Sequence, residues 1–96
     1  MSVYVMAQIS IVDRARYERY QAAFMDVLIQ YGGTLLAADE QPRVEEGEWQ
    51  YEKVILLSFP DHEAFRSWAD SPQYRQIAVD RHAGSTGVVL VVQGIR

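Results

Sequence analysis

Three aromatic residues with polar donors and one arginine suggest the chemistry of this sequence: Tyr20, Trp49, Tyr74 and Arg81. Small-molecule pockets are mostly apolar, with a few polar groups that fix the ligand's orientation, and a guanidinium can bind a carboxylate through two parallel hydrogen bonds. These residues are therefore predicted to line a pocket for a small, partly apolar anion. The alternative is that they are core residues whose polar atoms are bonded internally or reach the surface.

Arg81 decides between these alternatives more sharply than the aromatic residues do. It shares a predicted helical face with Tyr74 and Ile77, so its charge needs an anionic partner or a route to water. A bound carboxylate is one candidate partner. A carboxylate of the protein, such as Asp80 of a neighbour, is the other.

Residues for covalent or metal chemistry are few. The sequence has no cysteine, which removes disulfides, thiolate metal sites and cysteine nucleophiles. Its two histidines, His62 and His82, lie outside any ligand-spaced motif, so no metal or cofactor is predicted. Ser71 precedes a proline and is explained as a helix cap. His82 is the candidate acid–base catalyst, and whether the protein is an enzyme stays open.

Length and charge limit the class of protein. Ninety-six residues are expected to form one domain, 1–96, since two independent cores would not fit. The net charge is −4, with acidic residues gathered between 39 and 52 and no basic stripe, so no nucleic-acid partner is expected. No apolar run approaches the ~20 residues of a membrane span. The sequence opens on a strand pattern instead of a signal-peptide pattern, which predicts a cytoplasmic protein.

Hydrophobic periodicity predicts the elements that must position these residues. Apolar residues alternate from 3 to 11, which indicates a strand. Asp13 can cap a helix whose apolar stripe recurs every three or four residues until Gly32-Gly33. Further strands are predicted at 34–38, 49–59 and 87–93. Two more helical segments are predicted, one after Pro60-Asp61 and one from Ser71-Pro72 to Gly84. The polar segment 39–47 is expected to be an exposed connection with room for a short edge pairing.

The predicted order, βαββαβ, favours an α+β protein with a ferredoxin-like antiparallel sheet and helices on one face. The other face would then be apolar, because 88–92 is apolar on both sides. This helix-free face of the sheet is also predicted to carry Tyr4, Met6, Val54 and Leu56. Soluble monomers rarely expose such a patch, so a homodimer through this sheet face is predicted, with a pocket on the helix-covered face of each subunit. The alternative is that 88–92 is only a stiff core strand.

Motifs spread along nearly the whole chain resemble the domain of unknown function 1330 family. They are Tyr17 and Tyr20, Tyr31-Gly32-Gly33, Gly47-x-Trp49, Phe59-Pro60, Trp68, Ser71-Pro72-x-Tyr74, Arg81 and Gly94. The resemblance implies a dimeric α+β barrel, in which two ferredoxin-like subunits press their sheets together. The chain departs from the family pattern at three positions: Lys53 replaces an arginine, Ser58 a glutamate and Tyr51 a proline. The lysine lacks the bidentate fork of arginine, so an ion pair between 53 and 58 is not expected here.

The superfamily that the chain resembles includes cofactor-independent monooxygenases, haem-degrading oxygenases and muconolactone-type isomerases. The haem-degrading members rely on an asparagine, and this sequence has none, which excludes that subclass. Three hypotheses remain: a dimer that binds small carboxylates, a cofactor-independent oxygenase or isomerase, and a structural or interaction dimer. A pocket containing Arg81 would favour the first two. A cleft filled by Trp49 and Tyr20 would favour the third.

Overall fold

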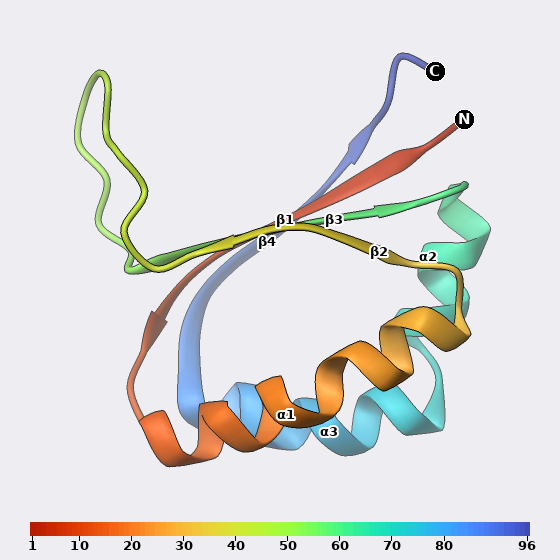
Figure 1. The fold of residues 1–96 in the computed structure, drawn as a ribbon, viewed down its shortest axis with the longest axis horizontal. Helices are drawn as coiled ribbons and strands as arrows, with labels where there is room; N and C mark the ends of the chain where they lie inside the picture. Colours follow the sequence, from red (N-terminus) through yellow and green to blue (C-terminus); the bar gives the residue numbers. More distant parts are fainter.

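A computed structural model describes residues 1–96 as a four-stranded antiparallel sheet with helices on one face (Figure 1). In chain order the elements are β1 (Val3–Ile11), α1 (Arg14–Gln30), β2 (Thr34–Asp39), β3 (Lys53–Phe59), α2 (His62–Ala69), α3 (Pro72–Gly84) and β4 (Ser85–Gln93). The strands are arranged β2-β3-β1-β4, with every neighbouring pair antiparallel. The predicted ferredoxin-like fold is therefore confirmed. None of the helices combines the length and the apolar composition needed to cross a membrane.

Each helix begins at a side chain that caps it. A carboxylate oxygen of Asp13 accepts a hydrogen bond from the backbone N–H of Arg16 at 3.2 Å, and Asp61 caps α2 in the same way. The hydroxyl of Ser71 accepts from the backbone N–H of Tyr74 at 3.0 Å, and Pro72 follows as the first helical residue. These local contacts fix where α1, α2 and α3 start, as predicted.

The predicted strand over 49–59 begins instead at Lys53, which pairs with Ile9 on β1. Residues 40–52 form a loop without strand pairing, and in Figure 1 it projects beyond the sheet on the side away from the helices. The strand-like alternation of Trp49 and Tyr51 has another origin. Their rings pack edge to face with centroids 6.1 Å apart, so the two aromatic residues contact each other without forming strand pairing.

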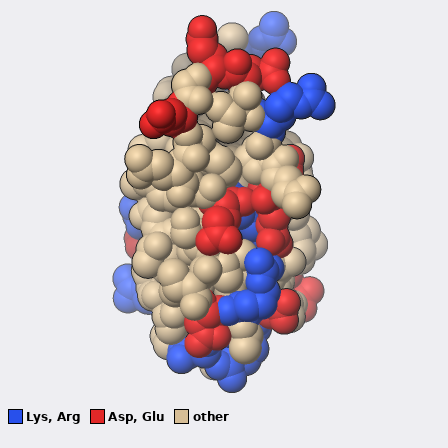
Figure 2. Space-filling view, turned by 90° about the vertical axis from the view of Figure 1, so that its left-hand side faces the viewer, with Lys and Arg blue, Asp and Glu red and all other residues tan.

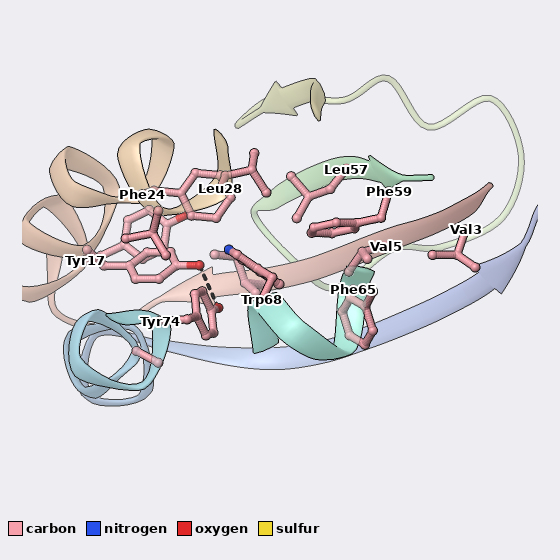
Figure 3. Packing of buried hydrophobic residues seen from close by; sticks show 14 residues of the cluster. Val3, Val5, Tyr17, Phe24, Leu28, Leu57, Phe59, Phe65, Trp68 and Tyr74 are labelled. Atoms are coloured by element: carbon pink, nitrogen blue, oxygen red, sulfur yellow. Dashed lines mark hydrogen bonds between the residues drawn. The ribbon is translucent and has the colours of Figure 1, made fainter. Parts of the chain in front are cut away.

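The core lies between the sheet and the helices. Fourteen buried apolar residues form it: Val3, Val5, Ile9, Tyr17, Tyr20, Phe24, Val27, Leu28, Leu57, Phe59, Phe65, Trp68, Tyr74 and Ala78. Figure 3 shows side chains from α1, α2, α3 and the strands meeting in this layer. Because alternate residues of β1 and β3 point towards the helices, the sheet contributes Val3, Val5, Leu57 and Phe59 to it.

The opposite face of the sheet carries no helix (Figure 1). Every residue of β4 from Val88 to Val92 is between 40% and 49% exposed, although Val89 and Val91 belong to the helix-facing side. The helical layer therefore leaves β4 uncovered on both sides. The apolar patch predicted from the sequence is real, because these residues are not a buried core strand.

Candidate functional site

A cavity of about 370 Å³ lies between the helices and the sheet, a volume within the range of about 300–1,000 Å³ typical of small-molecule sites. Nineteen residues from β1, β2, β3, β4 and all three helices line it, and sixteen of them are hydrophobic. The other three are Gln21, Lys53 and Arg81. An apolar wall with so few charged groups gives each of them a large influence on what can bind.

The hydroxyls of Tyr20 and Tyr74 meet in the wall of this cavity, with their oxygens 2.8 Å apart. The dashed line that ends at Tyr74 in Figure 3 marks this hydrogen bond. Burial raises the pKa of Tyr20 well above its ordinary value, and the neighbouring Tyr74 hydroxyl raises it further. Tyr20 therefore keeps its proton at neutral pH. One hydroxyl hydrogen joins the two oxygens, so the other is available to an acceptor in the cavity.

Arg81 reaches the cavity with part of its guanidinium unsatisfied. Its Nε is buried and has no hydrogen-bond partner, and no carboxylate of the chain forms an ion pair with it. Asp80, the protein carboxylate considered from the sequence, is instead bound by Arg16 and Arg19 of its own chain. The indole Nε1 of Trp68, also in the cavity wall, is the second buried donor without a partner. Buried donors left unpaired are uncommon, and the two residues that carry these donors line the same cavity.

Lys53 is a cavity residue that the sequence-based site did not include. It is only 4% exposed, and its Nζ donates to the side-chain oxygen of Gln21 at 3.3 Å. The same nitrogen lies 4.9 Å from the centre of the Tyr17 ring and 4.0 Å from a carboxylate oxygen of Glu40. Burial lowers the pKa of Lys53, while the charge of Glu40 opposes that shift and the charge of Arg14 adds to it. Its alternation with Ile55 and Leu57 along β3 was the signal in the sequence that could have placed it on the buried face.

Charged side chains gather at the end of the molecule nearest Lys53. Glu40 accepts two hydrogen bonds from Arg14, at 3.0 and 3.3 Å, and its side chain is partly exposed. In Figure 2, acidic side chains border a hollow at the centre of this end, and basic side chains lie within and beside it. The Lys53 end of the cavity thus approaches solvent beside Glu40.

Two of the predicted site residues lie elsewhere. Trp49 is on the opposite face of the sheet, where its indole N–H donates to the side-chain oxygen of Gln8 at 2.8 Å. The loop that carries Trp49 folds over that face, which the chain's local pattern did not indicate. His82 is exposed in the last turn of α3, 3.5 Å from an Nη of Arg81, and does not line the cavity. The structure therefore brings together Tyr20, Tyr74 and Arg81, but neither Trp49 nor His82.

Fold and cavity together define a ferredoxin-like α+β protein with an aromatic, cationic pocket between sheet and helices. The chain belongs to the family Domain of unknown function (DUF1330), which matches residues 2–95. The family resemblance seen in the sequence is thereby confirmed. None of the curated proteins matches the chain in sequence.

Solved structures share this fold at low sequence identity. A protein of unknown function from Rhodopseudomonas palustris has a TM-score of 0.84 and 14% identity, covering 99% of this chain and 83% of its own. SnoaB, a cofactor-independent oxygenase from Streptomyces nogalater, has a TM-score of 0.70 and 15% identity, covering 99% and 94%. A dimeric ferredoxin-like protein of unknown function from Jannaschia has a TM-score of 0.69 and 20% identity, covering 96% of each chain. Identities this low show only a common fold, so the function has to be inferred from the residues of the site.

Proposed function

We propose that this protein binds a small, partly apolar carboxylate in the cavity between its helices and its sheet. The observation that carries the proposal is the buried Nε of Arg81, which has no partner in the wall of an apolar cavity. An unpaired buried donor on a cation costs free energy, and an anion that reaches the guanidinium would offset that cost.

Other groups of the cavity support the same ligand class. Two cations, Lys53 and Arg81, line it, and Glu40 is the only carboxylate that forms an ion pair with either of them. The balance of charge therefore favours an anion. The free hydroxyl hydrogen of the Tyr20–Tyr74 pair and the indole N–H of Trp68 are further donors for carboxylate oxygens. The aromatic and aliphatic wall suits the apolar part of the ligand.

A thermal-shift screen of small aromatic and aliphatic carboxylates, each beside its neutral amide, tests this proposal. Carboxylates such as benzoate, phenylacetate and hexanoate are expected to raise the melting temperature, because a ligand that binds only the folded state stabilises it. Arg81→Ala should weaken binding about 10- to 100-fold, the usual effect of losing a hydrogen bond to a charged group. Arg75→Ala is the matched control, since Arg75 lies on the same helix but is exposed and outside the cavity.

Two results would contradict carboxylate binding. One is equal stabilisation by carboxylates and amides. The other is an Arg81→Ala variant that is less stable by itself but responds to carboxylates as the wild type does. Arg81→Lys, which keeps the charge but lacks the planar fork, should fall between wild type and Arg81→Ala. An absence of any stabilising ligand would favour the structural or interaction role.

A cofactor-independent oxygenase or isomerase is the second candidate function. The similarity to SnoaB supports it, as does a pair of hydroxyls able to donate a proton inside an apolar cavity. The test is to incubate each stabilising ligand with the protein in air and analyse products by mass spectrometry. Product formation that Tyr20→Phe reduces would support catalysis. Unchanged ligand would leave binding as the function.

A homodimer through the open sheet face completes the proposal. The support is the exposed apolar surface of β4, together with the apolar residues Tyr4, Met6, Val54 and Leu56 on the same face of the sheet. Structures similar to this chain from Jannaschia and from Bacteroides fragilis are described as dimeric. Pairing two such faces would remove the patch from water and leave each cavity on the helical side of its own subunit.

A further inference from the structure

The sequence contains one lysine and eight arginines, and the lysine is the buried one. The arginines that form ion pairs at the surface, such as Arg14, Arg66 and Arg75, have side chains 51–71% exposed, whereas the side chain of Lys53 is 5% exposed. A need for positive charge does not by itself explain why the buried residue is a lysine, because arginine supplies the positive charge at the other eight positions. Lysine differs from arginine in that it can lose its proton and act as a nucleophile.

We propose that Lys53 forms an imine with the aldehyde or ketone group of a carboxylate ligand held at Arg81. This inference rests on the proposed function and narrows its ligand class to carboxylates that also carry a carbonyl group. Lysines in hydrophobic pockets are the usual amines for such chemistry.

The surroundings of Lys53 hold its nitrogen in place. Gln21 accepts one hydrogen at 3.3 Å, and the ring of Tyr17 lies beneath the nitrogen at 4.9 Å. Gln21 is the only hydrogen-bond partner of Nζ, which leaves the lone pair of the neutral amine free for a carbonyl carbon in the cavity. The positive charge of Arg81, the other cation that lines the cavity, lowers the pKa of the Tyr17 hydroxyl.

Four effects determine the protonation of this amine. Desolvation lowers the pKa of Lys53, the charge of Arg14 lowers it further, and the carboxylate of Glu40 at 4.0 Å raises it. The fourth is the face of Tyr17, which favours the cation. The net shift is downward, so the neutral amine is more populated near neutral pH than for an exposed lysine.

The reaction balances without an oxidant or a reductant. The Nζ lone pair forms a bond to the carbonyl carbon, and the π electrons move to oxygen. One proton then passes from nitrogen to that oxygen to give the carbinolamine. The nitrogen lone pair expels the hydroxyl group, which takes a proton from solvent and leaves as water. The product is a protonated imine, whose positive charge lies beside Glu40.

Trapping with 4-formylbenzoate and sodium cyanoborohydride tests the proposal. The hydride converts the imine into a stable secondary amine, which adds the mass of the probe less one oxygen atom. Since Lys53 and the N-terminus are the only primary amines of the chain, peptide mapping locates the adduct without ambiguity. The expected result is one adduct on Lys53, suppressed by excess benzoate, with slower labelling by benzaldehyde, which lacks the carboxylate.

Variants separate chemistry from folding. Lys53→Met and Lys53→Arg should both lose the adduct, and Arg81→Ala should slow its formation. If Lys53→Met does not fold, suppression by benzoate on the wild-type protein decides the question, because it needs no variant. Labelling of the N-terminus alone, or labelling of Lys53 that benzoate does not affect, overturns the proposal.

Failure of this inference can be told from failure of the proposed function. If 4-formylbenzoate raises the melting temperature as benzoate does but leaves no adduct on Lys53, the imine is wrong and carboxylate binding stands. If no carboxylate stabilises the protein and benzaldehyde labels Lys53 as fast as 4-formylbenzoate does, both are wrong.

Discussion

Tyr17 lies at the charged end of the cavity, with its ring against Lys53 and its hydroxyl within the influence of both Glu40 and Arg81. Burial raises its pKa to about 12, and the negative charge of Glu40 adds to the effect, while Arg14 and Arg81 oppose it. A tyrosine this buried stays neutral in the folded chain at a pH where the unfolded chain has begun to ionise.

The pH dependence of stability should therefore change in Tyr17→Phe. The pKa of Tyr17 is about 10 when unfolded and about 12 when folded. The folded chain thus binds more protons than the unfolded chain between those values. The stabilisation from this group is complete below about pH 10 and is lost as the pH rises towards about 12, at most about 3 kcal/mol. Urea unfolding of both proteins between about pH 8 and 11 measures it.

Wild type should lose stability with rising pH more steeply than Tyr17→Phe above about pH 10. Comparing the two proteins removes the contributions of Tyr20 and Lys53, which both share. Parallel curves would show that the hydroxyl of Tyr17 ionises as freely in the folded chain as in the unfolded one.

At the scale of elements, the contact between α1 and α3 positions the hydroxyl pair of the cavity. Gly84, the last residue of α3, accepts hydrogen bonds from the backbone N–H groups of Val12 at 2.8 Å and Asp13 at 3.1 Å. A Cβ atom at Gly84 would lie 2.7 Å from the backbone nitrogen of Tyr17 and 3.0 Å from the backbone oxygen of Asp13. The absence of a side chain thus lets the end of α3 lie against the start of α1.

Gly84→Ala should force these two helices apart and destabilise the protein by about 1–3 kcal/mol, the usual cost of an added methyl group in a closely packed contact. Chemical unfolding measures the loss. The melting-temperature rise caused by carboxylates should also fall, because Tyr20 and Tyr74 are on the two displaced helices. Gln76→Ala, an exposed change in α3, is the control and should alter stability by less than about 0.5 kcal/mol. Equal stability of the two variants would contradict this account.

At the scale of the whole molecule, one side of the sheet has its helical layer and the other has none. The chain is short, so the apolar area it can bury alone is limited, and an interface would add to it. The loop at 40–52 projects on the open side, where Trp49 is bonded to Gln8 (Figure 1). This loop would border a partner placed against the sheet.

Leu90→Arg should convert the proposed dimer into a monomer, because it introduces a charge into the apolar face opposite Met6. Size-exclusion chromatography with light scattering at micromolar concentration measures the mass. Val79→Arg is the control: Val79 is apolar and 59% exposed, compared with 49% for Leu90, but lies on α3. The control should stay dimeric. A wild-type mass of one chain would rule out the proposed interface.

The sequence by itself determined the elements, their order and the fold class. A period of two residues, a period near 3.6 and capping side chains such as Asp13 and Ser71 all depend on residues close together in the chain. The apolar pattern of β4 also indicated the uncovered sheet face. The end of the loop before Lys53 was misjudged, because the alternation of Trp49 and Tyr51 resembles a strand.

Only the tertiary structure decided which side chains share the cavity. Tyr20 and Tyr74 are 54 positions apart, and Trp49 and Gln8 are 41 apart. Which face of the sheet a loop folds over, and whether a buried cation has a partner, depend on contacts between distant segments that no local pattern records. For that reason the sequence could name Arg81 as a candidate anchor but could not show its unpaired Nε. It also left Lys53, the single lysine, outside the site that the fold builds around it.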